Sequence, residues 1–319
     1  MQPLKASTSV EEQIQILRRR GMALEPEEAR RWLNTVGYYR LSGYAFVYRG
    51  PEADHFLPGV SFGDVVALYE FDRKLRTLIH DGIERVEIGL RAAVSRVVAD
   101  RYGAEGHLDP VNFRPTFDHA EWLAVAGRRA ARAKRHTVFV RHHEDHYAGR
   151  MPIWVVLEVL DFADVSRLVD GMRVADQWAV ADHLGLELDL ATLPAGSAKR
   201  AKKNHPVARW CEQLSIVRNT AAHHGRVWNR SFAPAPTAAL ASLPGMAALP
   251  SGQSERIGGA LMVIAACLRT LSPGSSWAGR IRRLVETELV PTRPGGPGEM
   301  GLQTGWNSPG GVLGTPPHG

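Results

Sequence analysis

Hydrophobic residues recur at spacings of three and four along most of this chain, which is the period of an α-helix with one buried face. The longest such pattern runs from Ser61 to Tyr102, and Asp81 with Gly82 marks a point where that helix could be interrupted. No segment shows a convincing strand pattern. The chain is therefore expected to be all-α.

Residues that favour helix starts mark several further elements. Ser9 with Glu12, and Asp118 with Glu121, have the spacing of a capping pair. The patterns predict helices from Ser9 to about Gly21, from Pro26 to about Gly37, from Asp118 onward, over PIWVVLEVLDFADVSRL from Pro152, from about Ala175 to Leu184, from about Ser254 to Leu271, and from about Ser276 to Val290. Residues 291–319 are rich in Gly and Pro and are expected to be disordered.

The helix that follows Pro206 carries the most unusual surface. Its apolar stripe is formed by Val207, Trp210, Leu214, Val217 and Ala221. At about 100° per residue, Asn219, His223 and Arg226 form a row nearly opposite this stripe, and Arg218 flanks the row. One side of the helix is therefore expected to pack into a core, while the other presents arginine, asparagine and histidine.

These residue types can cleave RNA without a metal ion. The 2′-OH beside each phosphodiester is a built-in nucleophile, so the protein must supply a base, an acid and positive charge. Histidine titrates near neutral pH and performs either proton transfer. Arginine is a permanently charged bidentate clamp for phosphate. We take Arg218, Asn219 and His223 as the candidate catalytic residues; alternatively, His223 only caps the end of its helix, where the helix dipole favours a cation.

The order Arg218, Asn219, three residues, His223 resembles the R-x4-H motif of HEPN-type ribonucleases. Its extension through Arg230, RNTAAHHGRVWNR, resembles the Abi-like (abortive infection, AbiD/AbiF-type) family. GYYRLSGY after Val36, LYEFDRKLR and the helix after Pro152 are similar to further signatures of that family, although Ala163 stands where the family often has Gly. The resemblance covers most of residues 12–230.

The resemblance implies a fold and an activity. The implied fold is a HEPN-like helical bundle over residues 61–290, with N-terminal helices and a Tyr/Arg-rich segment in residues 1–60. The implied activity is a metal-independent endoribonuclease that acts as a toxin-like anti-phage defence protein. HEPN sites form where two motif helices meet, and this chain has one clear R-x4-H, so a homodimer is expected. The alternative is a non-catalytic RNA-binding protein whose Arg/His row only grips phosphate.

Charge supports an anionic partner. The formal net charge is +6 with a pI near 9.5, which favours nucleic acid over membrane. Besides substrate RNA, a regulatory non-coding RNA would suit the basic segments. The residues expected to bind RNA are His224, Arg226, Tyr39, Arg40, Arg132, Arg135, Arg141, Lys199, Arg200, Lys202 and Lys203. For the lysine-rich segment between Leu186 and Asn204, the alternative is an ordinary solvated loop.

Several of these residues also have a structural interpretation. The aromatics of Gly37–Arg49 either stack on bases or anchor this turn on neighbouring helices. His142 and His146 lie one helical turn apart, yet the ligands that would complete a tetrahedral metal site are missing, so a surface helix end is favoured. Acids near the motif are too few for a two-metal nuclease. We therefore expect neither a metal nor another cofactor.

Three further expectations concern charge and location. The acidic and basic residues between Glu70 and Glu87 are interpreted as a solvated or interhelical charge face. Glu158 lies on an otherwise apolar helix and would need a partner if buried, for which Arg218 is a candidate. The sequence shows no signal-peptide pattern and no membrane-spanning run, and Cys211 and Cys267 fall in apolar stripes, so a cytoplasmic protein with buried free thiols is expected.

Overall fold

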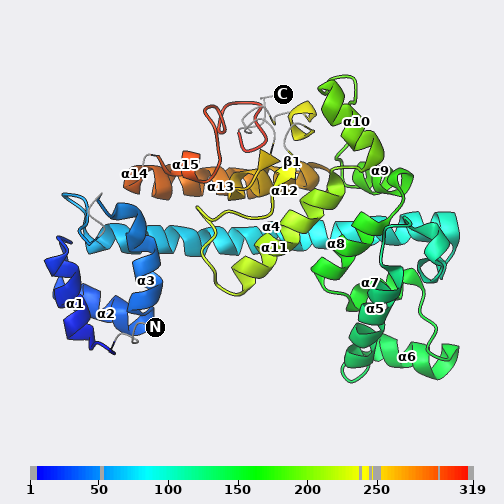
Figure 1. Ribbon diagram of the computed structural model, residues 1–319, viewed down its shortest axis with the longest axis horizontal. Helices are drawn as coiled ribbons and strands as arrows, with labels where there is room; N and C mark the ends of the chain where they lie inside the picture. Colours follow the sequence, from blue (N-terminus) through cyan, green and yellow to red (C-terminus); the bar gives the residue numbers. More distant parts are fainter. Residues whose placement is uncertain are drawn as a thin grey trace. The chain divides into compact units, whose positions relative to one another are not determined.

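The computed structural model describes residues 6–50, 54–236, 239–243, 246, 253–293 and 295–314. Over these residues the fold is all-α, as predicted (Figure 1). The strands in the described ranges are β1 (Ala235–Pro236) and β2 (Gln253–Ser254), which pair in antiparallel fashion. The chain divides into two compact units, Met1–Lys74 with Leu284–Pro294, and Leu75–Arg283 with Gly295–Gly319.

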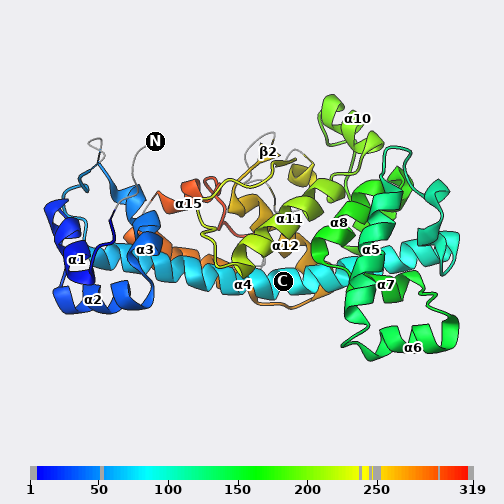
Figure 2. The same cartoon turned by 60° about the horizontal axis from the view of Figure 1, so that its bottom comes forward.

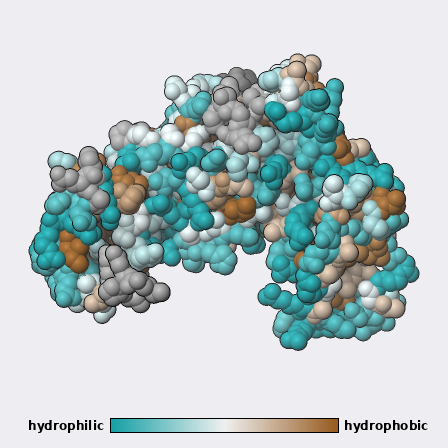
Figure 3. All heavy atoms as spheres, in the orientation of Figure 1, coloured by the Kyte–Doolittle hydropathy of each residue, from teal (hydrophilic) through white to brown (hydrophobic). Residues whose placement is uncertain are grey.

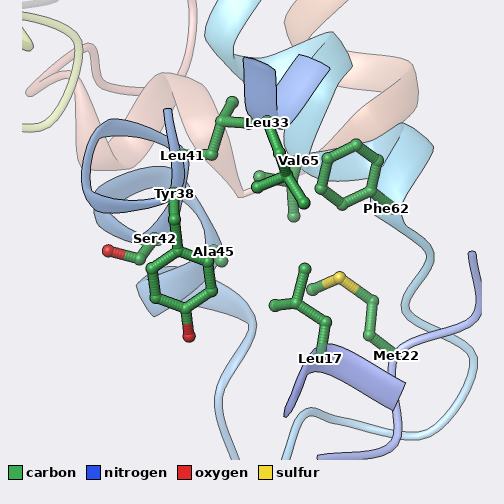
Figure 4. A pocket seen from close by; sticks show the side chains of 9 residues that line it. All are labelled: Leu17, Met22, Leu33, Tyr38, Leu41, Ser42, Ala45, Phe62 and Val65. Carbon is green, nitrogen blue, oxygen red and sulfur yellow. The ribbon is translucent and has the colours of Figure 1, made fainter. Parts of the chain in front are cut away.

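The first unit is built around three helices, α1 (Val10–Arg19), α2 (Pro26–Thr35) and α3 (Tyr38–Ala45), with the start of α4. The predicted capping box of Ser9 and Glu12 is present. Apolar side chains from all four helices face one another, among them Leu17, Leu33 and Phe62 (Figure 4). The cavity between them is about 10 Å³, which has room for one water molecule at most. The centre of this unit is therefore a packed core without space for a ligand.

Helix α4 (Phe62–Tyr102) is continuous, so the interruption considered at Asp81 and Gly82 does not occur. Gly82 is needed for packing. A Cβ atom there would lie 2.7 Å from Ile264 Cγ2 and 2.7 Å from Trp277 Cε2. The missing side chain lets two later helices approach α4 closely, and the indole of Trp277 donates a 2.6 Å hydrogen bond to the carbonyl of Leu78. Close helix packing offsets the low helix propensity of glycine.

The second unit holds most of the remaining helices. They are α5 (His119–Ala133), α6 (Val138–Tyr147), α7 (Ile153–Val159), α8 (Phe162–Gly171), α9 (Val174–His183), α10 (Ala195–Lys203), α11 (Val207–Ala222), α12 (Ile257–Leu271) and α13 (Trp277–Leu284). Short 3-10 turns cover Gly106–Leu108, Pro110–Asn112 and Leu240–Ser242 in this unit, and Phe46–Tyr48 in the first unit. Asp118 caps α5 as the sequence predicts, and α11 begins directly after Pro206, which is its N-cap in place of Asn204 or His205.

Two predictions in this unit were wrong. The single helix expected after Pro152 is divided into α7 and α8, because Leu160 is extended and Asp161 forms a new capping box with Asp164. The segment from Leu186 to Asn204, interpreted as a loop, contains helix α10. Its residues have good helix propensity, but the high density of lysine and arginine suggested a solvated loop.

Helix α11 lies at the centre of the second unit. It packs against α8 and α12, and both views show it beside α8 (Figures 1 and 2). The predicted apolar stripe is buried throughout, from Val207 at 0% exposure to Ala221 at 2%. The burial of this stripe positions the polar end of α11, which carries the candidate site.

The last part of the chain contributes residues to both units. After α13, a π-helical turn (Val285–Leu289) and α14 (Val290–Thr292) belong to the first unit, whereas α15 (Gly296–Glu299) belongs to the second. In residues 295–314, Met300, Leu302, Trp306 and Leu313 are buried. The Pro/Ala-rich connector before Gln253 lies partly outside the described residues. The domain boundaries at residues 60 and 290 stay predictions.

Helix α12 carries the longest apolar run, Ile257–Leu268, and every residue of it is buried. None of the helices in the described ranges combines the length and apolar composition needed to cross a membrane. Cys211 and Cys267 are buried and free, as expected. Burial raises the pKa of the Cys211 thiol to about 12, so this thiol is protonated and unreactive at neutral pH.

Candidate functional site

The candidate site lies where α11 ends. His223 is the C-cap, and the next residue, His224, has a left-handed backbone with φ of 56°. Backbone hydrogen bonds join Gly225 to Thr220 (2.9 Å) and His224 to Ala221 (3.0 Å), which is the Schellman pattern of a helix end. Arg226 therefore lies beyond the helix and does not extend the row of Asn219 and His223, contrary to the prediction.

Two contacts fix the turn after the helix. A Cβ atom at Gly225 would lie 2.9 Å from Thr220 Cγ2 and 3.1 Å from the Thr220 carbonyl oxygen, so a larger residue does not fit without movement. On the other side, the guanidinium of Arg76 on α4 donates a 3.5 Å hydrogen bond to the Gly225 carbonyl. Arg76 is only 6% exposed. The turn that carries both histidines is therefore attached to the longest helix of the protein.

The side chain of Arg218 contacts α4. Its Nε lies 3.8 Å from Glu87 Oε2, and Arg91 donates a 2.5 Å hydrogen bond to the other carboxylate oxygen. Arg91 also donates to the backbone carbonyls of Leu157 and Leu160 on the neighbouring α7 segment. Glu87 is 14% exposed and Arg218 40% exposed. The partner of Arg218 is thus Glu87; the predicted candidate, Glu158, is exposed and has no such role.

Asn219 and His223 face solvent on the outer side of α11. Within the described residues, the ring of His223 has no side-chain hydrogen bond, which leaves both ring nitrogens accessible. The side chains of Arg218 and His223 leave the helix in directions about 140° apart around its axis. The tip of its guanidinium nevertheless returns toward the outer side, because Nη1 donates a 3.3 Å hydrogen bond to Asn219 Oδ1. Asn219 therefore links the half-buried arginine to the exposed face with the histidine.

The other predicted RNA-binding residues fall into separate groups. Tyr39 and Arg40 belong to the first unit, on α3. In the second unit, Arg132, Arg135 and Arg141 lie around the junction of α5 and α6, and Lys199, Arg200, Lys202 and Lys203 lie on α10; all seven are exposed. Both views place α6 and α10 on different sides of α8 (Figures 1 and 2). The second unit therefore does not gather its predicted basic residues into one patch.

In the Tyr/Arg-rich segment Gly37–Arg49, some aromatic residues anchor the segment on neighbouring helices, and others are exposed enough to stack on bases. Tyr44 is 2% exposed, and its hydroxyl donates a 2.7 Å hydrogen bond to Asp72, so this ring anchors α3 on α4. Tyr39, by contrast, is 92% exposed. Phe46, at 63% exposure, lies under the guanidinium of Arg49 at 5.4 Å. Tyr39 and Phe46 are the rings of this segment that could stack on bases.

Helix α6 carries its histidines at the surface. The rings of His142 and His146 stack with centroids 4.4 Å apart, and His146 Nδ1 bonds the His142 carbonyl at 3.0 Å. Over the described ranges, no group of three or more His, Cys, Asp or Glu side chains is arranged to hold a metal ion. The exposure of His142 and His146 agrees with the interpretation of this segment as a surface helix end.

Three residues next to the site have roles that the sequence did not reveal. Glu87 contacts Arg218, Arg91 holds Glu87 in place, and Arg76 holds the turn at Gly225. Glu87 and Arg76 were included in a general charge face, of which Arg76 and Asp72 are in fact buried. The i,i+4 spacing of Glu87 and Arg91 was the available signal, but it is typical of ordinary exposed helix pairs as well.

The outer surface gives few indications of an apolar ligand. The face shown in Figure 3 is mainly hydrophilic, and its hydrophobic residues form small separate patches. Among the exposed apolar side chains, Ile216 lies on the same side of α11 as Asn219 and His223, and Ile88 follows Glu87 on α4.

Together these features describe a basic, all-α protein whose candidate site residues, Arg218, Asn219 and His223, lie at the end of its central helix. The model of the Abi-like protein family matches residues 31–229 of the chain, which is more than half of its length. The chain belongs to the Abi-like family. Among curated proteins and among solved structures, no match was found.

Proposed function

We propose that this protein is a metal-independent endoribonuclease of the HEPN type that acts on RNA in the cytoplasm as an abortive-infection defence protein. Membership of the Abi-like family supports the defence role. The observation that supports the nuclease most directly is the arrangement of Arg218, Asn219 and His223, with an exposed imidazole beside an oriented guanidinium. The chemistry of these groups suits cleavage by the 2′-OH of RNA itself.

In the proposed reaction, one His223 imidazole takes the proton of the 2′-OH, and the 2′-oxygen attacks the adjacent phosphorus. The bond from phosphorus to the 5′-oxygen breaks, and a second imidazole donates a proton to that leaving oxygen. The products are a 2′,3′-cyclic phosphate and a 5′-OH. Arg218 stabilises the charge on the pentacoordinate phosphorane, where a preorganised cation acts most strongly. Asn219 holds the guanidinium toward the exposed face.

This scheme needs two imidazoles, and one chain supplies one in the motif. We therefore propose a composite site across the two-fold axis of a homodimer. Asn219 holds the guanidinium of Arg218 toward the exposed face that also carries His223, so a second α11 packed on this face would meet both groups. A second copy, with its α11 facing the first, would bring its own His223 and Arg218 to the same phosphate. The site would then hold an acid, a base and two phosphate-binding arginines.

His224 and Arg226, in the turn after α11, are assigned to RNA binding. His224 and Arg226 are proposed to contact the RNA on either side of the scissile phosphate, and the exposed cations of α6 and α10 to contact more distant phosphates. A regulatory RNA that restrains the enzyme would use the same cations. If so, its binding must weaken as salt concentration rises, because each phosphate contact releases counterions.

The test is RNA cleavage in EDTA. Purified protein is incubated with single-stranded RNA, and the new ends are identified by mass spectrometry. We expect 2′,3′-cyclic phosphate ends, and a loss of activity on the order of a hundredfold for Arg218→Ala and for His223→Ala. Matched controls are Arg96→Ala on α4 and His183→Ala on α9, which remove an exposed guanidinium and an exposed imidazole elsewhere.

The outcomes separate the proposal from its rivals. A strict requirement for Mg²⁺ would exclude the metal-independent mechanism. If RNA is bound tightly but never cut, and His223→Ala still arrests growth, the protein is a non-catalytic RNA-binding member of a defence complex. Equal losses in the two control variants would show that the effects of Arg218→Ala and His223→Ala are not specific to the site.

A further inference from the structure

A cleft lies between α8, the first turns of α11 and the segment from Arg114 to Asp118, which leads into α5. Helices α8 and α11 pack against each other and lie side by side in both views (Figures 1 and 2). The volume of the cleft is about 320 Å³, at the lower end of the range for ligand sites. All its lining residues belong to the second unit. The cleft therefore has room for one small ring system.

A buried hydroxyl opens into this cleft. Ser166 on α8 is only 5% exposed, and it lines the cleft. Its hydroxyl has no hydrogen bond within the described residues, not even the bond to the carbonyl one turn earlier that a helical serine often makes. Over the same residues, the atoms that are both unpartnered and sealed from solvent do not include Ser166 Oγ, so the hydroxyl is accessible from the cleft. Because buried polar groups almost always have partners, this one indicates a ligand.

Two charged neighbours of Ser166 are also unpaired. Asp170 lies one turn further along the same face of α8, with about 5–6 Å between the Cβ atoms. In the described part of the chain, neither its carboxylate nor the guanidinium of Arg167 forms a hydrogen bond or an ion pair. Both side chains are exposed and line the cleft. Helix α8 thus presents a hydroxyl, a carboxylate and a guanidinium that are all available to a ligand.

The other charged groups of the lining already have partners. Arg114 donates a 2.7 Å hydrogen bond to Gln177 Oε1, Asp118 caps its own helix α5, and Arg209 forms an ion pair with Glu212. The lining balances three arginines against three acids, namely Arg114, Arg167, Arg209, Asp118, Asp170 and Glu212. Such a balance does not favour a bare phosphate. It suits a neutral ligand that carries both donors and acceptors.

A guanine base has this combination of groups. Its N1–H and its 2-amino group are adjacent donors that one carboxylate can accept together, and its O6 and N7 are acceptors. Adenine would turn its N1 acceptor toward the carboxylate, and cytosine and uracil lack the adjacent pair of donors. The half-buried ring of Phe117 adds apolar surface to the lining. Gly171 lets this ring lie against α8, because a Cβ atom there would be 2.4 Å from Phe117 Cγ.

We propose that this cleft binds one guanine base of the RNA. Asp170 accepts from N1–H and the 2-amino group, and Ser166 and Arg167 donate to O6 and N7. The inference rests on the proposed function, since it gives the same nuclease a sequence preference. Glu212 in the cleft and His223 lie on one side of α11, roughly 16 Å apart at 1.5 Å per residue. That span equals about five stacked nucleotides at 3.4 Å each, so the guanine lies about five nucleotides from the bond that is cut.

The test measures binding of fluorescent RNAs by anisotropy, in a His223→Ala background that prevents cleavage. The RNAs are identical except at one position, which holds guanosine, inosine or adenosine; inosine lacks only the 2-amino group. We expect guanosine to bind roughly tenfold more tightly than adenosine, with inosine between them. Asp170→Ala should abolish this ratio. The matched control is Asp145→Ala, an exposed acid on α6 outside the cleft, which should preserve it.

The buried hydroxyl needs its own variant. Because the hydroxyl of Ser166 has no partner to lose, Ser166→Ala should leave thermal melting unchanged or higher, yet reduce the guanosine preference several-fold. Ser215→Ala removes a buried hydroxyl outside the lining and should keep the preference. If both Asp170→Ala and Ser166→Ala retain the full preference, water fills the cleft and the proposal is wrong.

A titration with guanosine monophosphate distinguishes an RNA strand from a free nucleotide. The monophosphate is expected to bind much more weakly than the guanosine-containing RNA, because it lacks the contacts along α11. Equal affinities would mean that the cleft holds a free guanine nucleotide, and the assignment to RNA would be overturned.

The failures of the two proposals are distinguishable. In the active protein, RNA with a single guanosine should be cut at a fixed distance of about five nucleotides from it. If cleavage ignores the guanosine in the wild type and in Asp170→Ala alike, the guanine site falls while the nuclease stands. If RNA is never cut but Asp170→Ala alone loses the guanosine preference, the nuclease proposal falls and the guanine site remains.

Discussion

The guanidinium of Arg218 lies 3.8 Å from the carboxylate of Glu87, and the same carboxylate accepts a hydrogen bond from Arg91. The nearly buried carboxylate of Glu87 on α4 thus restrains the flexible side chain of Arg218, which is proposed to bind phosphate. Arg91 is anchored in turn to the backbone carbonyls of Leu157 and Leu160, so the orientation of Arg218 depends on contacts from two other helices. Glu87 is a positioning residue in this arrangement.

We predict that Glu87→Gln lowers kcat for RNA cleavage by roughly tenfold, because the guanidinium is no longer held in one orientation before the phosphate charge develops. The change also leaves Arg91 without its acid, so a loss of about 1–3 kcal/mol in the free energy of unfolding is expected. Urea unfolding measures the second effect and single-turnover cleavage the first. Glu84→Gln, on the exposed side of α4, should change neither. Full activity in a destabilised Glu87→Gln protein would show a purely structural role.

A second prediction concerns the backbone at His224. Within the described residues, His224 and Ala148 are the non-glycine residues with positive φ, at 56° and 51°. The left-handed conformation costs about 1 kcal/mol or more for a residue with a Cβ. His224→Gly should therefore leave the melting temperature unchanged or higher, yet weaken RNA binding because the imidazole is lost.

Ala148→Gly at the end of α6 is the control, since it relieves the same strain far along the chain from the motif. It should raise stability by about 0.5–1 kcal/mol and leave cleavage unchanged. If His224→Gly keeps full activity, the histidine serves only as a helix cap, and its strained backbone has no functional meaning.

The sequence predicts the fold class and the central helix well, because both depend on local patterns. The stripe of Val207, Trp210, Leu214, Val217 and Ala221 is buried as expected, and caps such as Ser9 and Asp118 lie where their chemistry indicates. The division between α7 and α8 was missed since Asp161 can also be an ordinary helix residue. The continuity of α4 at Gly82 depends on Ile264 and Trp277, which are far away in the sequence.

The candidate site, too, could be predicted only where local sequence patterns determine it. Local sequence indicates that Arg218, Asn219 and His223 share a helix end, but the partner of Arg218 is more than a hundred residues away, on α4. In the sequence, the i,i+4 spacing of Glu87 and Arg91 marks only an ordinary helix pair, and it is tertiary packing that makes Glu87 nearly buried and leaves Glu84 exposed. The unpartnered hydroxyl of Ser166 was equally hidden, since a sequence does not show which groups lack partners.

The third prediction is a loss of stability in mild acid. Burial lowers the pKa of both His107 and His205 to about 4, below the usual 6.5. Between these values the unfolded chain binds a proton that the folded protein does not, so stability is complete above about pH 6.5 and falls as pH decreases toward 4. Each histidine should cost about 2 kcal/mol between pH 7 and pH 5.

Urea unfolding at pH 7 and at pH 5 measures this loss. His107→Asn and His205→Gln should each reduce the difference between the two pH values, whatever they do to stability at pH 7. His142→Gln, at an exposed position on α6, should leave the difference unchanged. An unaltered pH dependence in both buried-site variants would mean that carboxylates, and not these imidazoles, control the acid response.

The final prediction tests the composite site through Ile216. This side chain is 37% exposed and shares the outer side of α11 with Asn219 and His223, so a second α11 that brings its own His223 to the same phosphate would cover it. Ile216→Glu would place two carboxylates in that contact, where like charges repel and lose water. In a monomer, an exposed substitution of this kind changes stability by only about 0.5 kcal/mol. We therefore expect sedimentation to show a shift from dimer to monomer, with melting little changed and cleavage reduced on the order of a hundredfold.

Val138→Glu on α6, where the residue is 72% exposed, introduces the same charge away from α11 and should leave both assembly and cleavage intact. An Ile216→Glu protein that is monomeric and fully active would exclude the two-copy site, because one His223 would then perform both proton transfers alone.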